Sequence, residues 1–438
     1  MSQQSVADRF LQIHSKIRTR FPQIERDVYG NKRIYLNSGA GTLMVDSAIY
    51  ALADKARTSN PQPGDIDPAE IATDQLHWGV RQFVADFIHA RKPEEISFHS
   101  STTHALFNLA YALRTILIKG DNLVVTDLDH MANISPWEDM WGSENDCQIR
   151  RAQVNGEGCL DVDHLLSLID GRTGLVAVTM ASNAFGSLVP LKEIIPLIRK
   201  KSARCLICVD AVHHALHGPI DVQEIDCDFL AFSGYKLFGP MLGVLWGKED
   251  LLRQLKPYRV ETNKDESPYK FEQGTLNNAL LAALEGALEY LLWLGDELTE
   301  EGEKVTPLRK DKLRFVMNAI AQYEGKLSQS ILESFQGLDG DKFRCYGLTN
   351  PERVLERDPT FSFEIRGRNP KEIKKYLWEN HGFQIADGNH YSAAICRHLG
   401  RDSICRASFA HYDALQITKS FVEALHRLLD ENSSGGEP

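Results

Sequence analysis

The segment "VDAVHHALHGPIDVQEIDCDFLAFSGYKLFGPMLGVLWG" occupies residues 209–247. One apolar strand ends in it at Asp210, and a second, "DFLAFSGY", is followed directly by Lys236. A short apolar run bounded by turn residues is typical of a buried strand. A charged group at the inner end of such a strand is costly unless it meets a partner or performs covalent chemistry. We therefore expect this segment to fix both the fold and the position of a functional site.

Similar strands occur upstream and alternate with helical patterns. The predicted strands lie within residues 95–100, 121–130, 174–183 and 204–213, and the predicted helices within residues 102–118 and 190–201. Near-continuous Val, Ile and Leu strands that alternate with helices are typical of a parallel sheet covered on both faces. The pattern predicts an α/β fold built on a mostly parallel sheet.

The C-terminal third of the chain has a different pattern. Residues 360–388 indicate a strand, a helix and a strand, with Pro370 near the helix start and Gly382 just past its end. A further strand and a closing helix follow. With 438 residues, the chain suits one large domain and a smaller one. The predicted division is an N-terminal helical segment (1–30), a large domain (31–295), a small α+β domain (296–430) and a disordered tail (431–438).

Composition narrows the functional classes. The net charge of -11 argues against nucleic-acid binding, which requires a basic face. The sequence shows no signal peptide and no apolar run of membrane-spanning length, so we expect a cytoplasmic location. The eight cysteines are scattered. Cys205 and Cys208 have CxxC spacing, but no second pair accompanies them, and we predict buried thiols and no metal site.

Polar residues follow the ends of successive predicted strands, where ligands bind in open α/β sheets. They are Thr102, Thr103, His130, Asn183, Asp210, His213 and Lys236. A helix start with adjacent hydroxyls favours phosphate. A buried aspartate favours a ring cation, and a lysine in a semi-apolar pocket is prepared for an imine. Phosphate, ring cation and imine together indicate pyridoxal 5'-phosphate (PLP).

Each of these residues taken singly has a structural alternative. Asp210 could cap a helix, Thr102 and Thr103 could form an N-cap, and Lys236 could make a salt bridge. Likewise, the histidines and Arg406 could be structural. The order and position of the whole set favour the PLP interpretation.

The chain resembles the class V aminotransferases, which are fold type I PLP enzymes, and in particular their cysteine desulfurase-like branch. Besides residues 209–247, the motifs that carry the resemblance are "STTHALFNLA" (101–110), "DHMANISPW" (129–137), "VTMASNAFGSLVPL" (178–191), "FEQGT" (271–275) and "CRASFAHY" (405–412). The resemblance extends from Arg33 to Leu428. It implies a fold type I PLP-dependent transferase with a seven-stranded-type sheet.

The resemblance also implies roles for these residues around the cofactor. Lys236 would form the Schiff base and later move the substrate Cα proton, and Asp210 would hold the ring nitrogen protonated. His213 would bond the ring hydroxyl, where desulfurases usually carry Gln, and His130 would stack on the ring. The phosphate would be bound by Thr102, Thr103, Ser233 and Tyr235.

The substrate side follows from the same resemblance. Arg406 would bind the substrate α-carboxylate, a task suited to a planar guanidinium. Asn183 would lie beside the ring hydroxyl and the substrate. Thr275 would reach the phosphate from a partner subunit, which implies a homodimer.

One loop departs from the family. Desulfurases of this branch carry an Arg-x-Gly-His-His-Cys loop whose cysteine accepts sulfur. The matching stretch is "IADGNHYSAAICRHLG" (385–400), with Ala386 in place of the arginine and Asn389-His390-Tyr391 in place of His-His-Cys. Cys396 lies in a helical pattern and is expected to pack in the small domain. His390 or Tyr391 could act as an acid or base or bind substrate; they could equally pack against the cofactor loop.

These features favour a PLP enzyme that acts on an amino acid through an external aldimine and a Cα carbanion. A C–S β-eliminating lyase needs no enzyme cysteine and is the first hypothesis. An aminotransferase and an amino-acid epimerase use the same starting groups and remain alternatives. A non-catalytic PLP-fold protein is a further alternative, which the retained Lys236 and Asp210 argue against.

Overall fold

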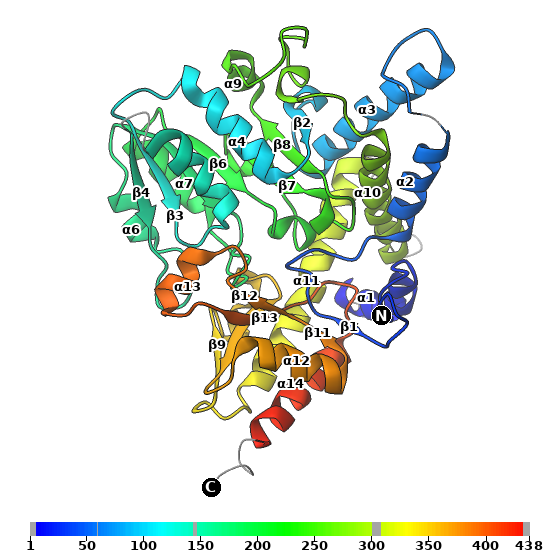
Figure 1. Cartoon of the computed structure of the whole chain (residues 1–438), viewed down its shortest axis with the longest axis vertical. Helices are drawn as coiled ribbons and strands as arrows, with labels where there is room; N and C mark the ends of the chain where they lie inside the picture. The colour runs from blue at the N-terminus through cyan, green and yellow to red at the C-terminus, as the bar shows by residue number, and fades with distance from the viewer. Residues whose placement is uncertain (1–5, 59, 143–146, 300–307, 432–438) are drawn as a thin grey trace, which may run out of the picture.

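The computed structural model describes residues 6–58, 60–142, 147–299 and 308–431. Its centre is a seven-stranded sheet in the order β2-β8-β7-β6-β5-β3-β4 (Figure 1). Strand β8 is antiparallel to β2 and β7, and the other pairs are parallel. The predicted mostly parallel sheet is thus confirmed. Its strands are β2 (Ile96–His99), β3 (Asn122–Thr126), β4 (Gln148–Ala152), β5 (Thr173–Thr179), β6 (Leu206–Asp210), β7 (Phe229–Ser233) and β8 (Gly243–Gly247).

Helices cover both faces of this sheet because neighbouring strand residues are apolar on both sides. Val125 belongs to the same apolar cluster as Leu109 of α4, whereas Val124 belongs to that of Ile195 in α7 and Leu288 in α10. The helices of the large-sheet region are α2 (Asp46–Thr58), α3 (Pro68–Phe87), α4 (Thr102–Ala112), α5 (Ser135–Trp137), α6 (Val162–Ser167), α7 (Leu191–Lys201), α8 (Val222–Ile225), α9 (Glu249–Gln254) and α10 (Asn278–Leu298).

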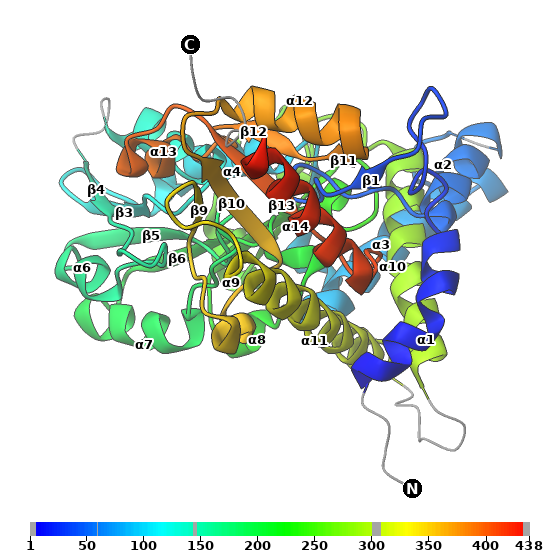
Figure 2. The same ribbon diagram turned by 90° about the horizontal axis from the view of Figure 1, so that it is seen from below.

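A smaller antiparallel sheet lies beside the large one. Its order is β12-β13-β10-β9, and the helices α12 and α14 run beside its strands (Figure 2). Asn369 caps α12, and Gly382 ends it in the left-handed conformation (φ 71°), which a glycine adopts without strain. The elements are β9 (Phe343–Tyr346), β10 (Thr360–Ile365), α12 (Pro370–His381), β12 (Ala386–Gly388), α13 (Ala393–Leu399), β13 (Ile404–Ser408) and α14 (Leu415–Asp430). The predicted smaller C-terminal α+β part is present.

Two connections tie the sheets together. Helix α11 (Arg309–Phe335) contacts α3 and α10 on one side and α14 on the other. After α1 (Val6–Thr19), strand β1 (Ile34–Tyr35) pairs in parallel with β11 (Phe383–Gln384), so an N-terminal segment joins the C-terminal part. The predicted boundary at 295/296 falls inside α10. The domain division stays a prediction, and most of the predicted disordered tail lies outside the described residues.

The start of α4 is pressed against the sheet at its functional end. A Cβ on Gly243 of β8 would lie 2.5 Å from the Thr102 backbone nitrogen, so only glycine allows this approach. The N-terminus of α4 is thereby placed beside the end of β7. Cys205 and Cys208 are buried at β6, as the sequence predicts. Among the described residues, no helix combines the length and apolar character needed to cross a membrane.

Candidate active site

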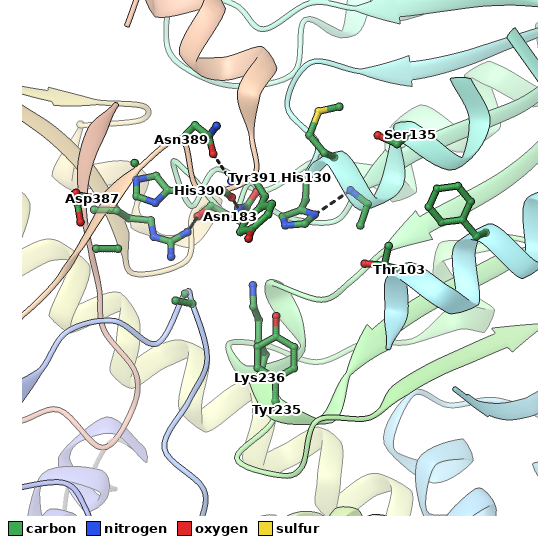
Figure 3. Close-up of a pocket in the computed structure, with 18 residues that line it drawn as sticks. Thr103, His130, Ser135, Asn183, Tyr235, Lys236, Asp387, Asn389, His390 and Tyr391 are labelled. Atoms are coloured by element: carbon green, nitrogen blue, oxygen red, sulfur yellow. Dashed lines mark hydrogen bonds between the residues drawn. The ribbon is translucent and has the colours of Figure 1, made fainter. Parts of the chain in front are cut away.

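The ends of the central strands open into a cavity of about 790 Å³ and, behind it, a recess of about 110 Å³. The residues that line both include Thr103, His130, Asn183, Tyr235 and Lys236. Thr102, Asp210, His213 and Ser233 line the recess, and Arg406, His390 and Tyr391 line the larger space. Every site residue predicted from sequence except Thr275 therefore lines the cavity or its recess, and Figure 3 shows the residues of the larger cavity.

Lys236 ends the short η6 turn (Gly234–Lys236) that follows β7, and only 4% of it is exposed. Its amine extends into the cavity (Figure 3). Burial, together with the nearby Arg406 charge, lowers the lysine pKa to about 7, although the Asp210 carboxylate opposes this shift. No carboxylate of the described residues lies within ion-pair distance of it, so the salt-bridge alternative does not hold for Lys236. Much of the amine is neutral near pH 7, as a nucleophile requires.

Asp210 and His213 form the floor of the recess. Asp210 ends β6, and its Oδ1 accepts a hydrogen bond from the Val212 backbone N–H at 2.8 Å. Burial raises the pKa of Asp210 to about 6, although the Val212 N–H and the Lys236 charge stabilise the carboxylate and oppose this shift. His213 is 2% exposed, neither ring nitrogen has a hydrogen-bond partner among the described residues, and burial lowers its pKa well below the usual value. Buried polar groups normally find partners, so these two residues suit a polar ligand.

The start of α4 presents hydroxyl groups to the recess. The Thr102 hydroxyl donates to the Phe232 carbonyl and contacts the Ser233 hydroxyl, both at 2.7 Å. Thr103 is exposed and points into the cavity (Figure 3). The N-cap is Ser101, whose hydroxyl accepts from the His104 N–H, so the capping alternative is wrong for the two threonines. Their hydroxyls and the helix start together suit an anion.

His130 follows β3 and carries a neutral imidazole. Its Nδ1 accepts a hydrogen bond from the Ala132 N–H at 3.0 Å, which leaves the proton on Nε2. Burial lowers its pKa to about 4, with Lys236 and Arg406 adding to the shift. The Tyr391 ring stacks on this imidazole with centroids 5.5 Å apart and an interplanar angle of 29°. The ring predicted to stack on the cofactor therefore also contacts the divergent loop.

Asn183 holds that loop in place with its side chain. Its Nδ2 donates to the His390 carbonyl at 2.8 Å, and its Oδ1 accepts from the Ser392 hydroxyl at 2.7 Å. His390 and Tyr391 adopt φ values of 54° and 56°, a left-handed conformation that costs energy for residues other than glycine. The predicted site residue Asn183 thus first serves to clamp residues 390–392 over the cavity.

Arg406 of β13 is a buried cation without an acidic partner among the described residues. It is 3% exposed; its Nη1 donates to the Asn183 carbonyl at 2.7 Å, and its Nε has no partner. Burial lowers its pKa to about 10. A Cβ on Gly39 would lie 3.2 Å from the guanidinium carbon of Arg406. The glycine therefore allows the loop that contains it to pack directly against this side chain. A buried, unpaired guanidinium suits an anionic ligand such as a carboxylate.

Thr275 and the cysteines lie away from the cavity. The Thr275 hydroxyl accepts from Gln62 Nε2 at 3.1 Å in a separate hollow of about 490 Å³. No cysteine is among the described residues that line the cavity or its recess. Cys396 lies in α13, 4% exposed, and burial raises its pKa. The thiol is thus protonated and packed away from the site, as the sequence predicts.

Sequence reasoning missed several lining residues. Phe107 lies one helical turn after Thr103, and Met131 and Ser135 lie in the quoted motif around His130. Each of them lies a few positions after a predicted site residue, and this spacing could have identified them as lining residues. The neighbouring Asp129 is not among the described residues that line the cavity or its recess: it is fully buried, which raises its pKa to about 8, and it accepts a hydrogen bond from Asn133.

The recess fits the cofactor that the sequence predicts. PLP needs an amine for its aldehyde, a carboxylate for its ring nitrogen and anion donors for its phosphate. Lys236, Asp210 and the hydroxyls at the start of α4 supply these groups, and the unpartnered His213 can meet the ring hydroxyl.

Comparisons with known proteins match nearly the whole chain. The sequence profile of aminotransferase class-V matches residues 34–314 and 308–416. A cysteine desulfurase of Pectobacterium atrosepticum is 32% identical over 429 residues, covering 94% of this chain and 97% of the relative. One of Yersinia pseudotuberculosis is 30% identical over 431 residues, with the same coverage. The cysteine desulfurase CsdA of Escherichia coli, in its S-sulfonic acid form, has a TM-score of 0.79 at 25% identity and covers 95% and 98%.

Proposed function

Because this chain belongs to the class V aminotransferase family of PLP-dependent enzymes, we propose that it is a C–S lyase acting on a cysteine derivative. Relatives named cysteine desulfurases, at 30–32% identity over nearly the full chain, support a sulfur amino acid as the substrate class. One observation carries the reaction type. The cavity keeps Lys236 and the unpaired Arg406, but no cysteine lines it to accept sulfur.

The residues of the recess would hold the cofactor. Lys236 would bond its aldehyde, Asp210 its ring nitrogen and His213 its ring hydroxyl, with His130 against the ring. Thr102, Thr103, Ser233 and Tyr235 would surround its phosphate. When bound, PLP supplies an acceptor for the electrons left at the substrate Cα.

The substrate would be oriented by Arg406 and deprotonated by Lys236. A guanidinium that bonds both carboxylate oxygens fixes the direction of the Cα–H bond. The neutral Lys236 amine accepts the Cα proton, and the Cβ–S bond then breaks with its electron pair leaving on sulfur. Addition of one water overall gives a thiol, pyruvate and ammonium. Because no enzyme thiol takes up the sulfur, it leaves as the free thiol or sulfide.

The cavity would also accept a group on the substrate sulfur. Its 790 Å³ extends from Lys236 to Phe107, Met131 and Tyr391, beyond the recess that suits the cofactor. Ala386, which lines it in place of the family arginine, leaves more room. We therefore infer that S-substituted cysteines are better substrates than cysteine.

The test is a visible absorbance scan of the PLP-loaded enzyme during addition of L-cysteine, S-substituted cysteines and plain amino acids, with pyruvate and thiol or sulfide assayed in parallel. We expect pyruvate and thiol in equal amounts. Conversion to the pyridoxamine form without pyruvate would instead establish an aminotransferase, and inverted chirality with the amine retained an epimerase. A protein without a visible band would be a non-catalytic member of the fold.

We further propose that the enzyme is a cytoplasmic homodimer. Thr275 lies outside the cavity of its own chain, which supports the expectation that it completes the phosphate site of a second subunit. Analytical ultracentrifugation and the cofactor affinity of Thr275→Ala test this proposal. A monomer that binds PLP normally would contradict it.

A further inference from the structure

Behind the recess lies a buried polar cluster to which sequence reasoning assigns no role. His217 and Glu324 of α11 are 1% and 2% exposed, and His217 Nδ1 lies 2.7 Å from Glu324 Oε2. His217 Nε2 has no partner. The His213 and His217 rings lie 5.2 Å apart at 57°, and one nitrogen of each lies within 4.8 Å of the other, a span that a single water can bridge. The cluster thus continues from the interior to the cofactor recess through His213.

The second carboxylate of the cluster is already engaged. Asp358 accepts from His214 Nδ1 at 3.1 and 3.2 Å through its two oxygens. A divalent cation between His213, His217 and Asp358 would compete with this contact. Protons, rather than a metal ion, are therefore the species that these groups suit.

We propose that the His217–Glu324 pair is a positioning element that sets the hydrogen-bonding direction of His213. This inference rests on the proposed placement of the cofactor in the recess. A buried carboxylate and a buried imidazole in contact share a proton between them. Because His217 Nδ1 makes this contact with Glu324, the other ring nitrogen, Nε2, carries a proton and can donate it toward His213. A neutral His213 that accepts on one nitrogen must carry its proton on the other. Its remaining N–H is then presented to the recess as a donor to the ring hydroxyl oxygen.

The electrostatics of the cluster agree with this arrangement. Burial raises the Glu324 pKa to about 7 against the opposing effect of His217, and Glu324 and Asp358 raise the His217 pKa against burial. Both shifts favour retention of the shared proton by the pair. Burial lowers the His213 pKa well below its usual value, and the charges of His217, Lys236, Arg406 and His214 lower it in the same direction, so His213 is neutral. Asp358, Asp413 and the His411 backbone N–H also face the pair.

The test is a pH titration of the visible band of the PLP-loaded chain, with the cofactor dissociation constant as a second measurement. Without the pair, His213 loses its fixed donor direction, and negative charge on the ring oxygen is less stabilised. We expect the pH at the midpoint of this titration to rise by about one unit in Glu324→Gln and in His217→Gln, which is an ordinary size for the effect of a neighbouring group on a pKa. Glu324→Asp should recover part of the shift.

Tyr290→Phe is the matched control. It removes an equally buried contact, between the tyrosine hydroxyl and His411 Nε2 at 2.6 Å, but neither residue lines the cavity or its recess. It should leave the midpoint unchanged. If the single variants do not fold, the double variant His217→Leu/Glu324→Met removes both partners and leaves no unpaired charge. It should show the same shift.

An unchanged midpoint and cofactor affinity in folded, loaded variants would overturn the proposal, as would an equal shift in Tyr290→Phe. One bound metal ion per purified chain, measured by mass spectrometry, would also overturn it in favour of an ion site. The readouts require only bound cofactor, so a chain that binds PLP but eliminates nothing still tests the pair. Failure here and failure of the proposed function are therefore distinguishable.

Discussion

Two regions of the cavity differ in how closely they follow the family. The ends of β6 and β7 place Asp210 and Lys236 at the recess, and both are residues that the resemblance to the family predicts there. The loop 388–392 faces them and is a clamped segment that contains His390 and Tyr391, where the resemblance to cysteine desulfurases predicts a cysteine that accepts sulfur. Under the proposed function, activation of the substrate and release of its sulfur would therefore depend on separate structural elements. One can change while the other is retained.

The largest effect is expected from Lys236→Ala, which removes the amine that follows β7. The visible band should disappear, and pyruvate formation should fall by at least roughly 10²–10⁴-fold, the usual contribution of a positioned acid or base. Absorbance and single-turnover pyruvate assays measure both.

Lys270→Ala is the control for this variant. Lys270 is likewise buried, but its amine donates to the Leu255 carbonyl at 2.8 Å, and it does not line the cavity. The control should lose stability and keep the band. A band that survives in Lys236→Ala would mean that the cofactor is bound elsewhere.

Asp210→Ala should have the next largest effect. It would leave the cofactor ring nitrogen unpaired, and loss of one partner of a buried ion pair costs about 3–5 kcal/mol. Activity should fall by roughly a hundredfold to a few thousandfold. Asp129→Asn is the matched control, because burial raises the Asp129 pKa to about 8 and an amide resembles the protonated acid. Near-normal turnover in Asp210→Ala would show that the ring is placed wrongly.

The rate of PLP loading into the chain stripped of cofactor should depend on pH through Lys236. Because its pKa is lowered to about 7, the reactive neutral amine increases by about tenfold per pH unit below pH 7 and levels off above it. Arg406 contributes to the lowering, so Arg406→Leu should move the curve to higher pH. Stopped-flow absorbance measures the rate. A curve that levels off only near pH 10 would contradict a buried, neutral amine.

On the divergent side, Ser392→Ala should loosen the loop. It removes a buried hydrogen bond to Asn183 worth about 1 kcal/mol, which corresponds to roughly a fivefold rise in KM for an S-substituted cysteine. Ser202→Ala loses a comparable buried bond, to the Thr173 carbonyl, away from the cavity. It should lower stability without a change in KM. Equal KM values in the two variants would indicate that the clamp does not shape the substrate site.

Sequence predicted the side of the cavity formed by the ends of β6 and β7 better because its signals are local. Continuous apolar strands end at Asp210 and Lys236, and each polar residue follows its own strand. The loop side depends on contacts across long sequence separations, such as Asn183 with His390 and Ser392, for which no local pattern exists. The edge strand β4 (Gln148–Ala152) escaped prediction because its residues are mostly polar and incompletely buried. Glu324 was missed because its partner His217 lies on a distant turn.

The smallest effect is expected from Cys396→Ser, which tests whether any enzyme thiol accepts sulfur. Cys396 lies buried in α13, and its raised pKa disfavours the thiolate that would attack sulfur. Turnover, measured as pyruvate and thiol release, should stay within about twofold of the original enzyme, since the change removes only a packed sulfur atom. Cys396→Ala also loses the thiol but adds no hydroxyl. A defect found only in Cys396→Ser would therefore come from the buried hydroxyl and not from loss of the thiol. If both variants stop sulfur release while the protein stays folded and loaded, the sulfur passes through Cys396 and the loop must open to reach it.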